Sequence, residues 1–147
     1  MEPVWGCFCD FHKWYDTETW ELVERLFGAR PPVVQRQRAQ MKESFSLKLT
    51  WLWEQVRHMP GTIDLETLRQ YTRCYIMLLI GGYLMMDKSN NLVHLQWLPL
   101  LVDFRMCRGL SWGSAVLAWT YHSLCSAAHR GTTDIAGCTP LLMSSIY

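Results

Sequence analysis

Residues 71–91, YTRCYIMLLIGGYLMMDKSNN, form the most hydrophobic passage of this 147-residue chain. No charged side chain occurs from Tyr75 to Met86, whereas Arg73 precedes this stretch and Asp87 follows it. As a helix the uncharged stretch would be roughly 18 Å long, but spanning the hydrocarbon core of a bilayer requires roughly 30 Å. The stretch is therefore predicted to be the central helix of a folded domain and not a membrane anchor.

The predicted central helix covers residues 65–86. Asp64 suits its N-cap, because a short acidic side chain can accept a hydrogen bond from the first free backbone N–H groups. Ile63 and Leu68 have the spacing of a hydrophobic staple across that cap. The sequence therefore predicts both the start of this helix and the way in which its start is fixed.

Gly81 and Gly82 interrupt the predicted helix, and each lowers helix propensity by about 1 kcal/mol. A glycine is tolerated inside a helix where another element must approach closely. We therefore expect Gly81 or Gly82 to face a neighbouring helix, and the whole of residues 75–86 to be buried.

Apolar residues recur at helical spacing on both sides of this segment, and no run alternates with a period of two. A first helix is expected to end at Phe27, since Gly28 suits the position after a helix and prolines follow. The first helix starts at Asp16 or Thr17 and has Trp20, Val23 and Phe27 on one face, and a second helix, capped by Ser46, has Leu49, Leu52, Trp53 and Val56 on one face. A short helix with Pro99 in its first turn is predicted to reach Phe104. Another helix, capped by Ser111, covers residues 112–130, and helical turns are predicted at the chain end. The helix predicted at residues 112–130 has apolar residues on so many sides that we expect both of its sides to be covered.

The fold class predicted from this pattern is all-α, a compact bundle of about five to six helices. Residues 1–45 are expected to form an N-terminal helix and linker, and residues 46–147 the helical core. The formal net charge of +1 gives no general attraction to nucleic acid or anionic lipid. Three of the six cysteines, Cys74, Cys107 and Cys125, lie in or beside apolar stretches, so we expect buried free thiols in a reducing compartment.

Several separate sequence blocks follow one another with recognisable spacing between Trp51 and Met143. These blocks are Tyr71–Arg73, Gly81-Gly82, Asp87-Lys88-Ser89, Val93-His94-Leu95, Trp97–Leu101, Ser111–Ala115 and Gly137-Cys138. Together they closely resemble the plant mobile domain family, which is also labelled aminotransferase-like and includes the maintenance-of-meristems-like proteins. Residues 18–32, ETWELVERLFGARPP, resemble an upstream segment of the family. Because members usually have a longer N-terminal half, the resemblance implies a core truncated at both ends.

The resemblance implies a nuclear plant protein. Members occur in plant transposable elements and in host proteins linked to transposon silencing, genome stability and meristem maintenance. Some are fused to, or act with, type-7 serine/threonine phosphatases. We therefore expect a non-enzymatic protein-interaction module in the nucleus, with such a phosphatase as a candidate partner and with no membrane association.

The candidate chemical groups do not form a convincing catalytic, cofactor or metal site in the sequence. Lys88 lacks the glycine-rich phosphate cup that a pyridoxal-phosphate enzyme needs. Cys7, Cys9 and His12 offer three zinc ligands with poor spacing, and a fourth ligand is missing unless Asp10 or a distant Cys supplies it. The remaining candidates are His94, expected to form a buried hydrogen bond, His122 with Cys125 on one helix face, His129, and the hydroxyls of Ser114 and Ser123. We expect no catalytic residue, no cofactor and no metal.

Two alternatives to an interaction module stay open. A nucleic-acid-binding module derived from a transposon would use the basic residues Arg30, Arg36, Arg38 and Lys42. A gene fragment would have no function of its own. If the chain is an interaction module, its exposed aromatic residues are candidate anchors for a partner or for the missing half of the domain, and these are expected to include Trp5, Trp14 and Trp20.

Overall fold

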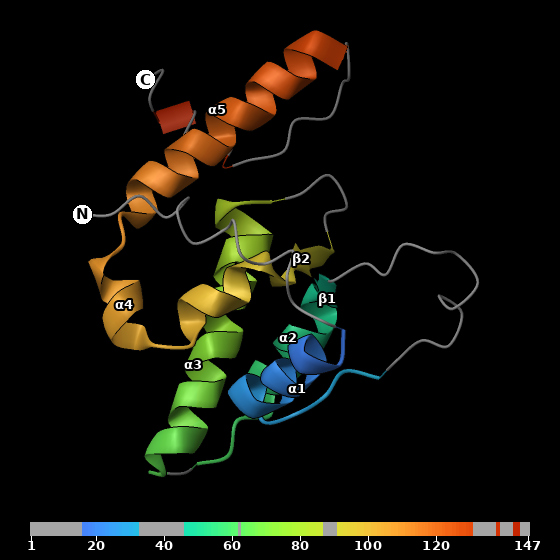
Figure 1. Cartoon of the computed structure of the whole chain (residues 1–147), viewed down its shortest axis with the longest axis vertical. Helices are drawn as coiled ribbons and strands as arrows, with labels where there is room; N and C mark the ends of the chain where they lie inside the picture. The colour runs from blue at the N-terminus through green and yellow to red at the C-terminus, as the bar shows by residue number, and fades with distance from the viewer. Residues whose placement is uncertain are drawn as a thin grey trace.

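The structure is a computed structural model, and it describes residues 16–32, 46–61, 63–86, 91–130, 138 and 143–144. Helices predominate in these residues, and α3 runs through the middle of the molecule (Figure 1). In chain order the elements are α1 (Asp16–Phe27), β1 (Ser46–Lys48), α2 (Leu49–Arg57), α3 (Leu65–Leu79), the π-helix η4 (Ile80–Leu84), β2 (Leu92–His94), the 3-10 helix η5 (Leu95–Leu101), α4 (Phe104–Gly109) and α5 (Trp112–Arg130). The predicted mostly helical class is confirmed, with a small sheet in addition. In the described part of the chain, no helix is long and apolar enough to cross a membrane.

The central helix begins where the sequence predicts. Asp64 is its N-cap, and the Thr67 backbone N–H donates a hydrogen bond to Asp64 Oδ2 over 2.9 Å. The helix then continues through η4 as far as Leu84. The predicted hydrophobic staple is wrong, because Ile63 is 99% exposed and Leu68 is only half-buried. The side-chain cap therefore fixes the start of the helix without help from the staple.

One side of the central helix is buried and the other is not. Cys74, Met77 and Ile80 lie in the single hydrophobic core, to which α1, α2, β2 and η5 also contribute. Tyr75 and Tyr83, however, are 51% and 68% exposed. The expectation that residues 75–86 are buried throughout is therefore corrected, because no described element covers these two tyrosines.

Gly81 makes the close approach that the sequence predicts for one of the two glycines. A Cβ atom on Gly81 would lie 2.5 Å from Val93 Cβ and 2.9 Å from Leu49 Cδ2. The close neighbours are therefore strand β2 and the first residue of helix α2. A Cβ on Gly82 would meet no heavy atom of the described residues within 4 Å.

Strands β1 and β2 form a two-stranded antiparallel sheet that the sequence does not predict. Ser46 pairs with His94, so it belongs to a strand and is not the N-cap of α2. Leu47 pairs with Val93, and both are buried. Three residues per strand give too short an alternation to be recognised in the sequence, and only the pairing of two distant segments makes them strands.

Helix α1 ends as predicted, since Gly28 has a φ of 73° and its N–H donates to the Glu24 carbonyl over 2.8 Å. Its side chains Val23 and Phe27 lie in the core, and Trp20 is half-buried against that core. Trp20 is therefore a packing residue, which corrects its prediction as an exposed anchor. Helix α2 likewise buries Leu52 but leaves Trp53 58% exposed, contrary to the predicted apolar face.

The segment around Pro99 is organised differently from the prediction. Pro99 lies inside η5, and no helix runs from it to Phe104. A new helix, α4, starts there instead, with Asp103 as its N-cap accepting from the Arg105 N–H over 2.8 Å. The core residues Trp97, Leu98, Leu100 and Leu101 all come from η5, so this 3-10 helix contributes a large share of the buried apolar surface.

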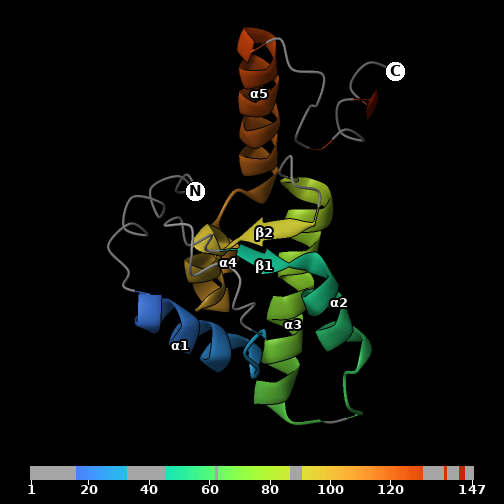
Figure 2. The ribbon, with the colours of Figure 1, turned by 90° about the vertical axis from the view of Figure 1, so that its right-hand side faces the viewer.

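Helix α5 packs against the rest of the molecule mainly through its first half. The rings of Trp119 and Trp97 meet edge to face at 5.7 Å, and Trp119 Nε1 donates to the Met86 carbonyl over 3.4 Å. Leu117 and Tyr121 are 46% and 62% exposed, so the expectation that both sides of this helix are covered is wrong. Figure 2 shows the reason, because α5 extends away from the other helices.

Candidate protein-interaction surface

A buried arginine holds four elements together in the body of the molecule. Arg73 on α3 is 6% exposed, and its Nε donates to the Leu101 carbonyl over 3.0 Å. Its Nη1 donates to the Leu26 carbonyl over 3.3 Å and lies 3.6 Å from Glu66 Oε1. The guanidinium carbon is 5.1 Å from the centre of the Phe104 ring, which is a cation–π distance.

The surroundings of Arg73 explain how a charge is tolerated there. Leu26 is in the last turn of α1 and Leu101 is the last residue of η5. Carbonyl groups at a helix C-terminus lack partners and carry partial negative charge. One guanidinium therefore satisfies two helix ends and fixes α1, η5 and the start of α4 to α3. The sequence places Arg73 in a family block, but no local pattern indicates these long-range partners.

Large apolar side chains remain exposed around this well-filled core. On the central helix, Tyr75, the half-buried Leu79 and Tyr83 follow one another at intervals of four residues. Residues four apart lie on one side of a helix, so we call these three residues the tyrosine stripe. The other large hydrophobic side chains that are exposed are Trp53, Met59, Ile63, Leu65, Val102, Met106, Leu117, Tyr121 and Met143.

The structure does not assemble the candidate catalytic groups. His122 and Cys125 are both exposed, and in the described residues no hydrogen bond joins them. His129 Nδ1 instead lies 2.8 Å from the backbone carbonyl of Cys125. The Ser114 hydroxyl accepts a hydrogen bond from the Ser111 hydroxyl over 2.8 Å, which is a local contact at the start of α5.

His94 forms a hydrogen bond, as predicted, but it is exposed and not buried. Its Nδ1 accepts from the Gln96 N–H over 3.1 Å and so caps the start of η5. The ring therefore has a local structural partner, at the point where the strand β2 becomes a helix.

The described thiols divide into two groups. Cys74 and Cys107 are buried as predicted, whereas Cys125 is exposed, which corrects the expectation for that residue. Burial raises the pKa of the Cys74 thiol to about 12, and it also raises the pKa of Cys107. The two buried thiols are therefore neutral and act as apolar packing groups.

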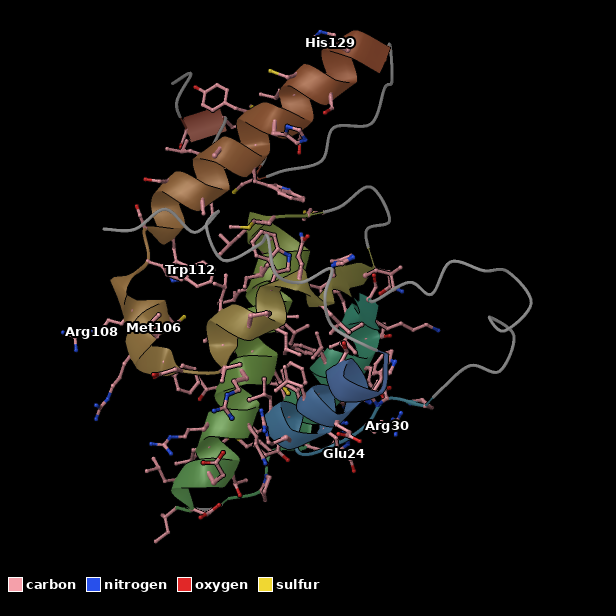
Figure 3. The ribbon with its side chains drawn as sticks, viewed as in Figure 1. Glu24, Arg30, Met106, Arg108, Trp112 and His129 are labelled. Atoms are coloured by element: carbon pink, nitrogen blue, oxygen red, sulfur yellow. The ribbon has the colours of Figure 1, made fainter. Side chains whose placement is uncertain are left out.

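Several sequence candidates lie outside the described residues, namely Trp5, Cys7, Cys9, His12, Trp14, Arg36, Arg38, Lys42 and Lys88. Of the predicted basic segment, the structure places Arg30, which is exposed beyond the end of α1 (Figure 3). Within the described ranges, no three His, Cys, Asp or Glu side chains are grouped so that they could hold a metal ion.

Fold and surface thus define a mostly helical domain with a hydrophobic core, a buried arginine centre and exposed aromatic side chains. The profile of the plant mobile domain family matches residues 11–144. The chain therefore belongs to the plant mobile domain family. No solved structure matches the chain.

The similar proteins are from Arabidopsis thaliana. The chain is 38% identical over 127 residues to a serine/threonine-protein phosphatase 7 long form homolog. This aligned region covers 86% of the chain and 9% of that relative. It is 32% identical over 101 residues to protein MAIN-LIKE 2, covering 69% of the chain and 15% of the relative. It is 27% identical over 97 residues to protein MAINTENANCE OF MERISTEMS, and this alignment covers 66% of the chain and 20% of the relative. The chain thus spans a small part of the length of these relatives.

Proposed function

We propose that this chain is a non-enzymatic protein-interaction module of the plant nucleus, with a role in meristem maintenance and in the silencing of transposable elements. The name of one relative, MAINTENANCE OF MERISTEMS, supports the first role. The family resemblance supports the second role and the nuclear location. The surface supports an interaction module, as the following contacts explain.

The observation that carries the proposal is the exposure of Tyr75 and Tyr83 beside a filled core. Both side chains are more than half exposed, although Cys74 and Met77 on the same helix are almost fully buried. Tyrosine combines a large apolar ring with a hydroxyl group, and it is enriched where proteins bind one another. The tyrosine stripe therefore offers rigid anchors on a helix whose opposite side is fixed in the core.

A type-7 serine/threonine phosphatase is the partner that we propose for this surface. One relative carries the name of such a phosphatase, and the region similar to this chain is 9% of its length. Two domains that are fused in one protein often bind each other when they occur in separate proteins. In such a complex the catalytic step would belong to the phosphatase.

The test is isothermal titration of the full chain with the catalytic domain of a plant type-7 serine/threonine phosphatase. We expect saturable binding, and we expect the double variant Tyr75→Ala with Tyr83→Ala to weaken it by about tenfold or more. Ile63→Ala is the matched control, because Ile63 is 99% exposed but lies outside the tyrosine stripe. Absence of binding would overturn the phosphatase as partner, and equal binding by the double variant would overturn the stripe as its surface.

A further inference from the structure

A second exposed apolar surface lies on α5 and has the spacing of a coiled-coil seam. Leu117, Tyr121, Leu124 and Ala128 follow one another at intervals of four, three and four residues. Alternating intervals of three and four residues place side chains along one narrow stripe of a helix, where a second helix can pack at a shallow angle. We call these four residues the α5 seam.

No element in the described part of the chain covers the α5 seam. Leu117 is 46% exposed, Tyr121 is 62% exposed, Ala128 is exposed and Leu124 is half-buried. The core instead receives Ala115, Val116 and Trp119 from other sides of the same helix. With 19 residues, α5 is about 28 Å long, and both views show it extending beyond the body (Figures 1 and 2). A partner helix could therefore lie along the seam without displacing any described element.

Charge narrows the choice of partner. From residue 104 to residue 130 the chain has three arginines and two histidines, and it has no Asp or Glu. Figure 3 shows Met106 and Arg108 at the outer edge of α4, close to the foot of α5, and His129 near the far end of α5. Helix α1, by contrast, contains four acidic residues and one arginine. The exposed Arg105 and Arg108 on α4 thus place positive charge at the foot of the apolar seam, and no carboxylate of residues 104–130, the α4–α5 arm, offsets it.

We propose that the α5 seam binds an acidic amphipathic helix of another protein, a proposal that rests on the function of the chain as an interaction module. Apolar side chains of that helix would pack on Leu117, Tyr121 and Leu124, and its flanking carboxylates would face the basic arm. A second copy of this chain fits less well. It would bring arginines and histidines of both arms together without any carboxylate from residues 104–130 to pair with them.

The probe is a fluorescent helical peptide of about three heptads, with Leu at the a and d positions and Glu at the e and g positions. A second peptide has Lys in place of every Glu. Fluorescence anisotropy measures the binding of each labelled peptide to the full chain. We expect the Glu peptide to bind at least about tenfold more tightly than the Lys peptide, with an advantage that shrinks as salt is added.

Two seam variants and one control make the surface assignment testable. Tyr121→Glu introduces a charge and Leu117→Gln a neutral polar group, and each should weaken binding of the Glu peptide by about tenfold. Trp53→Glu is the matched control, because Trp53 is 58% exposed, close to the 62% of Tyr121, but lies on α2, outside both the seam and the tyrosine stripe. Circular dichroism of each variant should show an unchanged helical spectrum.

Each contrary result overturns the proposal in a different way. Equal binding of both peptides would show that the partner helix need not be acidic. Unchanged binding by both seam variants would show that the peptide binds outside the α5 seam. A concentration-dependent dimer that Tyr121→Glu dissociates would assign the seam to a second copy. Duplex DNA that displaces the peptide would assign the arm to nucleic acid. If the phosphatase binds the chain but the Glu peptide does not, the proposed function stands and only the seam proposal fails.

Discussion

Gly81 and Val93 are packed so closely that a Cβ atom on Gly81 would lie only 2.5 Å from Val93 Cβ. Val93 is 2% exposed and is the middle residue of strand β2, paired with Leu47 of β1. The contact therefore joins the central helix to the small sheet through atoms that are fixed to two backbones. The contact also explains why glycine, and not a residue that favours a helix, stands at position 81 of this strongly apolar segment.

Replacing Gly81 by alanine should destabilise the protein by about 2 kcal/mol, because the strand and the helix must separate to admit the new methyl group. Gly82→Ala is the matched control. Its new Cβ would meet no described atom within 4 Å, and alanine favours a helix by up to about 1 kcal/mol. Urea unfolding of both variants measures the difference, and equal effects of the two substitutions would contradict the account of this contact.

Replacing Arg73 by methionine should destabilise the protein by about 3 kcal/mol. The buried carbonyls of Leu26 and Leu101 would each lose a charged donor. Chemical denaturation measures this loss. Glu66→Gln should change stability by less than about 1 kcal/mol, since Glu66 is 57% exposed and water can replace its ion pairs with Arg69 and Arg73. A mild effect of Arg73→Met would mean that this residue does not organise the helix ends.

The two kinds of thiol should differ in reactivity. Native protein at pH 8 should react with iodoacetamide at the exposed Cys125, while Cys74 should react only on unfolding, because burial raises its pKa to about 12. Mass spectrometry of the digested peptides assigns each modification. The raised pKa also means that Cys74 favours the folded state fully below pH 9 and progressively less as the pH rises towards 12. Rapid native labelling of Cys74 would contradict its buried position.

The cap at Asp64 should make stability depend on acid pH. The side-chain and backbone hydrogen bonds from Thr67 hold the pKa of the Asp64 carboxyl below its usual value of 3.8. The folded state therefore gains stability from the ionised carboxylate above pH 3.8, and this gain is lost as the pH falls below it. Asp64→Ala should accordingly lower the melting temperature at pH 6 more than at pH 3. If Asp64→Ala lowers the melting temperature equally at pH 3 and pH 6, the ionised carboxylate is not the group that stabilises the start of α3.

Local signals in the sequence predict the starts and ends of helices well. Asp64 before the central helix and Gly28 after α1 act through the nearest backbone groups, so their chemistry can be recognised without the rest of the fold. The close neighbour of Gly81 is predictable for a similar reason, because only a tight contact justifies glycine in such a segment. The family resemblance predicts a plant mobile domain, and the family profile that matches residues 11–144 confirms it.

Long-range packing decides what the sequence cannot predict. Ser46 forms a strand because His94 lies opposite it, and Arg73 is buried because two distant helices end beside it. Apolar side chains such as Tyr75, Tyr83 and Tyr121 have the spacing of a buried face, yet they are exposed. Periodicity shows which residues share a side of a helix, but it does not show whether the same chain covers that side.

We propose that the exposed tyrosines serve a partner and not the fold. Thermal unfolding of the single variants Tyr75→Ala, Tyr83→Ala and Tyr121→Ala tests this proposal. Circular dichroism should show a cooperative transition within about 2 °C of the unmodified chain for each variant, since exposed side chains away from special contacts contribute about 0.5 kcal/mol or less. A fall of roughly 5 °C or more, or a broad transition, would show that these rings support the fold, and would contradict their assignment to an interaction surface.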